Sequence, residues 1–173
     1  MQRSGQQRYM RRSMLGVTLI EMLVVTILLG ASLSLAVPSF NSMTERNQSA
    51  TQINEMITAI NLARSEATKI GSVVSMRAAA PTTDNELGGG WCVAAGTPTD
   101  CTGALIRAFP ALQGNTTLNV VPNADALQFN AYGELVGGAE LSLIFCSATK
   151  KRKLTISPVG RTRIVDANAL ACT

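Results

Sequence analysis

The chain has 173 residues, of which 46% are hydrophobic, a size that suits one domain with an N-terminal anchor rather than two full domains. It contains no histidine, so the commonest general base and metal ligand is missing. We therefore expect no enzymatic activity, no cofactor and no metal site. The formal net charge is +4, but the charges are unevenly distributed along the chain.

The N-terminal part of the sequence is predicted to be a membrane anchor. Residues 1–16 contain four arginines and no acid, and residues 17–40 form an apolar run in which Glu21 is the only ionisable residue. As a helix this run would be about 36 Å long, which is enough to cross a bilayer core. The positive-inside rule leaves residues 1–16 in the cytoplasm and the following domain outside, in the periplasm.

Glu21 is unusual because a carboxylate within an apolar span costs on the order of 3 kcal/mol. Two interpretations are open. Glu21 could lie near enough to the lipid headgroups to reach water, or it could pair with a group on a neighbouring chain.

Residues 41–71 are predicted to form the amphipathic second half of the same helix. Apolar residues recur there at spacings of three and four, which marks one buried helical face: Ile53, Met56, Ile57, Ile60, Ala63, Ala67 and Ile70. Gly71 is a suitable end for the helix. Pro38, near the join of the two halves, could kink the helix or melt a turn.

Residues 72–173 have the pattern of a small β domain. Short apolar segments are separated by Gly, Pro, Asn and Asp, as in hairpins. The expected strands are residues 73–78, 91–95, 104–109, 116–121, 126–130, 141–146, 154–157 and 163–166, and residues 81–90 are expected to form a mobile loop. A long helix followed by antiparallel strands predicts the α+β class.

Four cysteines lie in this domain, at Cys92, Cys101, Cys146 and Cys172. An exported domain lies in an oxidising compartment, so we expect disulfides rather than buried free thiols. Cys92 and Cys101 flank a short turn-like segment and can form a local bridge. That pairing leaves Cys146 with Cys172.

The C-terminal segment is basic while the rest of the chain after the first 16 residues is acidic. Residues 141–173 carry a net charge of +5, and residues 17–140 carry −5. The positive charges are Lys150, Lys151, Arg152, Lys153, Arg161 and Arg163. They could belong to a solvated hairpin, or they could contact the phosphates of double-stranded DNA without reading its sequence. Residues 150–153 are expected to be the turn of that hairpin.

The segment from Gly16 to Glu21 resembles the cleavage signature of type IV pilins. The resemblance implies that a prepilin peptidase cuts after Gly16 and methylates the new N-terminus at Val17, where the family normally has Phe. It also implies that Glu21, the fifth residue of the processed chain, neutralises the N-terminal amine of an adjacent subunit during assembly.

Four further segments resemble the FimT/GspH group of minor pilins and pseudopilins: residues 62–67, 90–93, 129–133 and 156–161. The resemblance implies a long helix packed on β-sheets, other pilin or pseudopilin subunits as partners, and an inner-membrane protein that enters a filament. Residues 160–163 match a Gly-Arg-x-Arg motif that the resemblance associates with DNA binding and natural transformation. The alternative is a GspH-like pseudopilin of type II secretion with no nucleic-acid role.

Overall fold

The computed structural model describes residues 16–80, 87–147 and 150–167, apart from the side chains of residues 34–39 and 42. The chain divides into two units, residues 1–40 and 41–173. One long helix, α1 (Leu19–Ile70), begins in the first unit and ends in the second. The second unit also contains eight strands.

The beginning of α1 is capped by Thr18. The backbone nitrogen of Glu21 donates a hydrogen bond to Thr18 Oγ1 at 3.3 Å, and that of Met22 donates to the Thr18 carbonyl oxygen at 3.2 Å. Thr18 and Glu21 therefore occupy the first and last positions of a Thr-x-x-Glu capping sequence, where a carboxylate also faces the positive end of the helix dipole. Glu21 is thus the acidic residue of the first helical turn, where a negative charge favours the helix.

The large apolar side chains between residues 17 and 33 of the first unit are exposed. They are Val17, Leu19, Ile20, Met22, Leu23, Val24, Val25, Ile27, Leu28, Leu29 and Leu33. Within the part of the chain that the structure describes, no helix is both long enough and apolar enough to cross a membrane. The membrane span expected at residues 17–40 stays a prediction. The helical backbone continues through Pro38, so no turn is melted there.

The second part of α1 carries the apolar stripe that its spacing predicts. Five of its members are buried: Ile53, Met56, Ile60, Ala63 and Ala67. Ile57 is partly buried against the core, whereas Ile70, in the last turn, is 45% exposed. The helix ends at Ile70, and Gly71 follows with a φ of 65°, the left-handed conformation that commonly stops a helix.

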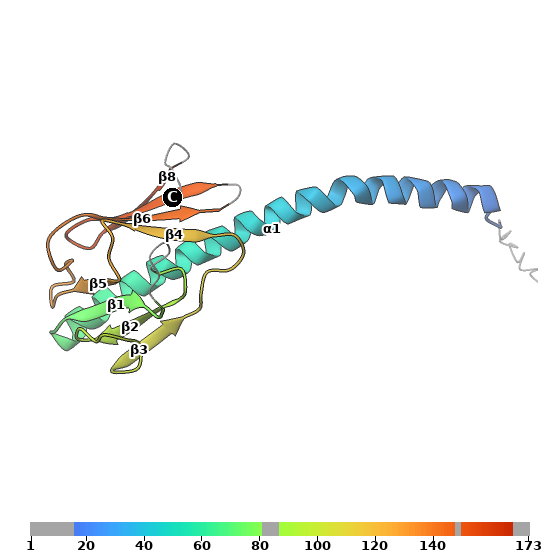
Figure 1. The fold of residues 1–173 in the computed structure, drawn as a ribbon. Helices are drawn as coiled ribbons and strands as arrows, with labels where there is room; N and C mark the ends of the chain where they lie inside the picture. The colour runs from blue at the N-terminus through green and yellow to red at the C-terminus, as the bar shows by residue number, and fades with distance from the viewer. Residues whose placement is uncertain (1–15, 81–86, 148–149, 168–173) are drawn as a thin grey trace, which may run out of the picture. The chain divides into compact units, whose positions relative to one another are not determined.

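The strands form two antiparallel four-stranded sheets, and Figure 1 shows one toward the top and the other toward the bottom of the second part of α1. The first sheet has the order β3 (Leu105–Phe109), β2 (Trp91–Ala95), β1 (Val74–Ala78), β5 (Ala126–Phe129). The second has the order β4 (Thr117–Val121), β6 (Leu141–Cys146), β7 (Lys151–Ile156), β8 (Thr162–Asp166). The predicted α+β class, with one long helix and antiparallel strands, is confirmed.

The strand boundaries agree with the sequence prediction to within one residue, except for β7. Residues 151–153 were expected in a turn but belong to the strand, since Lys151 pairs with Cys146 and Lys153 with Ile144 of β6. Pairing with β6, an inner strand of the sheet, outweighs the low intrinsic strand propensity of lysine. Of the expected loop at 81–90, residues 81–86 lie outside the described residues.

The predicted bridge between Cys92 and Cys101 is confirmed. Inside the segment that it closes, the carboxylate of Asp100 accepts hydrogen bonds from the hydroxyl and the backbone nitrogen of Thr102, at 2.6 and 2.9 Å. These bonds lower the pKa of Asp100. Cys146 is also disulfide-bonded, and Cys172, its predicted partner, lies outside the described residues.

Candidate nucleic-acid interface

The β7–β8 hairpin places three of the predicted cations on one side of the second sheet. Lys153 pairs with Val165, and Thr155 pairs with Arg163. Because paired residues share a face and side chains alternate along a strand, Lys153 and Arg163 point to the same face. Arg161 lies in the turn between the two strands, directly before β8.

These three cations line a single hollow of about 670 Å³. Its walls are Glu140, Lys153, Thr155, Ser157, Val159, Arg161, Thr162, Arg163 and Val165. Glu140 is the only acid among them, and it forms no ion pair with the three cations in the described ranges. The hollow therefore has a net charge of +2, with hydroxyl groups beside the cations, which suits phosphate groups.

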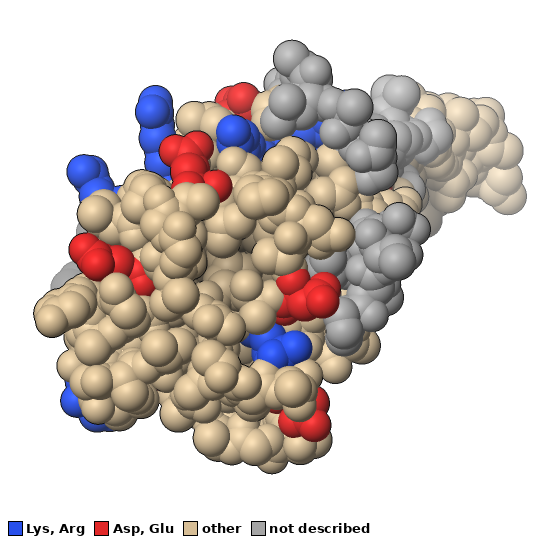
Figure 2. All heavy atoms as spheres, turned by 60° about the vertical axis from the view of Figure 1, so that its left-hand side comes forward, with Lys and Arg blue, Asp and Glu red and all other residues tan. Residues whose placement is uncertain are grey.

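The other three predicted cations lie elsewhere. Arg152 is on the opposite face of β7, the side of the buried Leu154, and Asp166 is the residue opposite it in the β7–β8 ladder. Lys150 lies in the β6–β7 turn, and Lys151 begins β7 at the end of the strand away from Arg161. On the face that Figure 2 shows, Lys and Arg side chains are interspersed with Asp and Glu. The structure thus divides the expected basic cluster and leaves Lys153, Arg161 and Arg163 as its only members in the hollow.

Arg64 of α1 fixes the position of the β7–β8 turn. Its Nε donates to the carbonyl oxygen of Gly133 at 3.0 Å, and its Nη2 donates to that of Val159 at 3.2 Å. Gly160 packs against this pair, because a Cβ atom there would lie 2.4 Å from Arg64 Nε and 2.6 Å from the Gly133 oxygen. Three of the segments that resemble the FimT/GspH group therefore meet at one point. Sequence spacing contained no signal for this convergence.

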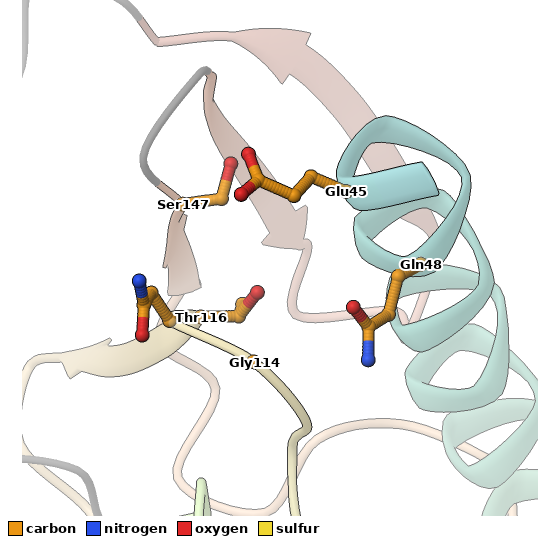
Figure 3. Close-up of a pocket in the computed structure, with 6 residues that line it drawn as sticks. Glu45, Gln48, Gly114, Thr116 and Ser147 are labelled. Atoms are coloured by element: carbon orange, nitrogen blue, oxygen red, sulfur yellow. The ribbon is translucent and has the colours of Figure 1, made fainter. Parts of the chain in front are cut away.

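A second hollow, of about 190 Å³, lies between the second part of α1 and the strands (Figure 3). It is lined by Glu45, Gln48, Gly114, Asn115, Thr116 and Ser147, with Glu45 as its one charged residue. A single carboxylate offers no acid–base pair. Among the residues that the structure describes, no group of three His, Cys, Asp or Glu side chains could hold a metal ion.

A long helix whose first part is apolar and whose second part packs on two antiparallel sheets is the fold of type IV pilin-like proteins. The chain has the fold of this class. The family described as "Type II transport protein GspH" matches residues 52–160, and the chain belongs to this family. The resemblance to the FimT/GspH group is thereby confirmed. The matched range ends at Gly160, directly before Arg161.

Solved structures show the same fold. The type IV minor pilin FimU of Pseudomonas aeruginosa has 23% sequence identity and a TM-score of 0.61, covering 74% of this chain and 95% of FimU. The minor pseudopilin EpsH of the type 2 secretion system of Vibrio cholerae has 12% identity and a TM-score of 0.50, covering 69% of this chain and 97% of EpsH. At such identities the likeness is one of fold. No match was found among curated proteins.

Proposed function

We propose that this protein is a minor subunit of a type IV pilus and that its β7–β8 hollow captures DNA for uptake. The exposed apolar surface of residues 17–33 carries the first part of the proposal. Eleven large apolar side chains between Val17 and Leu33 are exposed in the single chain. An exposed apolar surface of this extent marks a site that another protein or a membrane covers, since contact with water is unfavourable. In a filament, the helices of neighbouring subunits cover this surface.

The proposal includes the processing that the N-terminal signature implies. The peptidase cut after Gly16 exposes the amine of Val17, four residues before Glu21, and the chain is held in the inner membrane until it joins the filament. Leader cleavage, methylation and membrane insertion stay predictions, supported by the sequence of residues 1–40.

Loss of the Glu21 charge is expected to reduce incorporation into filaments. In Glu21→Gln the side chain can still serve the helix cap, because Gln is accepted at that position, but it cannot pair with a neighbour's amine. In Glu21→Ala both contributions are lost. We expect both variants to accumulate in the cell and to be depleted at least several-fold from sheared filaments, as measured by immunoblotting.

Comparison of the two Glu21 variants separates charge pairing from capping. Normal incorporation of Glu21→Gln together with poor incorporation of Glu21→Ala would show that only the cap matters. Normal incorporation of both would contradict any assembly role for this carboxylate.

The hollow is expected to bind double-stranded DNA weakly and without sequence preference. If Lys153, Arg161 and Arg163 each contact a phosphate, the logarithm of affinity should fall with the logarithm of salt concentration at a slope of about −2.7. The double variant Arg161→Ala/Arg163→Ala should bind more weakly and flatten this slope by about two. Titration of duplex DNA at several salt concentrations, with the full chain kept in nonionic detergent, measures both quantities.

A matched control removes the same charge outside the hollow. Lys150→Ala/Arg152→Ala lowers the net charge by two, as the first double variant does, but leaves the hollow intact. We expect it to keep most of the affinity. Equal losses in the two double variants would mean that overall charge, and not the hollow, attracts DNA.

A second candidate function is that of a minor pseudopilin in type II secretion, with no nucleic-acid role. The family description favours it, as does a matched range that stops short of Arg161 and Arg163. A deletion strain tested for twitching, secretion and transformation distinguishes the two. Loss of secretion with normal transformation would replace the pilus proposal.

A further inference from the structure

The loop after β5 presents Tyr132 to solvent on a well-held turn. The side chain is 84% exposed, the largest exposed fraction among the aromatic residues described. The backbone around it is fixed, because Asn130 Oδ1 accepts hydrogen bonds from the backbone nitrogens of Tyr132 at 2.9 Å and Glu134 at 3.0 Å. The backbone nitrogen of Gly133 also donates to the carbonyl oxygen of Asn130 at 2.8 Å. An aromatic ring on this turn contributes little to packing.

This turn is joined to the turn that carries Arg161. Arg64 holds the carbonyl oxygen of Gly133, and the backbone nitrogen of Leu135 donates to the carbonyl oxygen of Pro158 at 2.8 Å. The contact between Gly133 and Gly160 places the neighbouring residues Tyr132 and Arg161 within roughly 14 Å, Cα to Cα, since consecutive Cα atoms are about 3.8 Å apart. Tyr132 itself lines a separate shallow hollow beside Arg64 and Thr68 of α1, so only a ligand several nucleotides long spans both the ring and the cations of the β7–β8 hollow.

The chemistry of the surroundings indicates what covers the ring. Val136 and Val159 are about half exposed nearby, so a protein partner would find some apolar surface. The adjoining hollow has three cations against Glu140, however, and a ligand that spans both must be anionic as well as flat. Nucleic-acid strands combine these properties, because phosphates repeat beside bases that stack on aromatic rings.

We propose that Tyr132 stacks on an unpaired base while Lys153, Arg161 and Arg163 hold the adjoining phosphates, so that the preferred ligand is single-stranded DNA. This inference rests on the proposed capture of DNA by the hollow. Duplex DNA offers the same phosphates, but its bases are stacked within the helix. A single strand, or a frayed duplex end, satisfies both parts of the surface.

The test compares two strands of about 12 nucleotides, within the usual range of such sites, one of thymidines and one abasic, with the full chain in nonionic detergent. Both strands carry the same phosphates. Wild type is expected to bind the thymidine strand about 5- to 150-fold more tightly than the abasic one. Tyr132→Ala should bind both strands equally, at the wild-type affinity for the abasic strand, while Tyr132→Phe should retain the preference.

Each other outcome overturns the inference. Equal binding of the two strands by wild type, with the Arg161→Ala/Arg163→Ala variant still weakened, would remove the stacking and leave DNA capture in place. Absence of binding to both strands and to duplex DNA would remove DNA capture and the stacking with it. Unchanged strand preference in Tyr132→Ala, accompanied by reduced filament incorporation, would assign the ring to a protein contact.

Discussion

Replacement of Trp91 by alanine is expected to lower the free energy of unfolding by about 3–5 kcal/mol, the usual cost of removing a large aromatic side chain from a core. Trp91 is fully buried in β2 and stacks on Phe109 of β3, with ring centroids 5.7 Å apart and an angle of 13° between the planes. A domain of this size has only about 5–15 kcal/mol of stability, so this loss approaches complete unfolding. Urea denaturation followed by circular dichroism measures it.

Trp91→Phe is the control, because it keeps a ring against Phe109. It also removes the indole N–H, which is buried and has no hydrogen-bond partner among the described residues. We expect a loss of less than about 2 kcal/mol, since most of the apolar volume is retained. A loss below 1 kcal/mol for Trp91→Ala would show that the space around Phe109 collapses without penalty.

The helix and most strands could be predicted from sequence because their signals are local. The three-and-four spacing of Ile53, Met56 and Ile60 reports directly which face of α1 is buried. Strands such as β2 and β6 are short apolar runs between turn residues, and their limits follow from those turns. The bridge between Cys92 and Cys101 could also be predicted because it is local, with a separation of nine residues.

The candidate site could be predicted only in part, because its geometry depends on contacts between distant segments. Arg161 and Arg163 were identified from a short motif, but nothing local shows that Lys153 joins them and that Arg152 does not. That division comes from the register of β7 with β6 and β8. A one-residue change of register would exchange the faces of Lys153 and Arg152.

The convergence at Arg64 is the clearest case of non-local information. Its hydrogen bonds reach Gly133 and Val159, which are 69 and 95 residues away in the sequence. The exposure of Tyr132 and its closeness to Arg161 follow from the same contacts. Residues 150–163 contain no aromatic residue, so no local pattern indicates a ring beside these cations, and only the fold brings Tyr132 near them.

Replacement of Gly160 by alanine is expected to lower the free energy of unfolding by about 2–4 kcal/mol. Gly160 has a φ of 76°, and a residue with a Cβ atom in this region costs roughly 1–2 kcal/mol. The added methyl group would also lie 2.6 Å from the carbonyl oxygen of Gly133 and 2.4 Å from Arg64 Nε. Arg64 can rotate away at the cost of its hydrogen bonds, but a backbone oxygen moves only if the whole turn moves. Thermal or urea denaturation measures the change.

Gly138→Ala is the matched control for backbone strain. Gly138 has a φ of 65°, and a Cβ atom there would have no other atom within 4 Å, so only the conformational cost of about 1–2 kcal/mol applies. The difference between the two variants measures the close packing at Gly160. Because that packing positions the turn before Arg161 and Arg163, Gly160→Ala should also weaken DNA binding, whereas Gly138→Ala should not. Equal losses of stability in the two variants would mean that the Arg64–Gly133–Gly160 contact is loose enough to absorb a methyl group, and that Arg64 does not hold the hairpin in place.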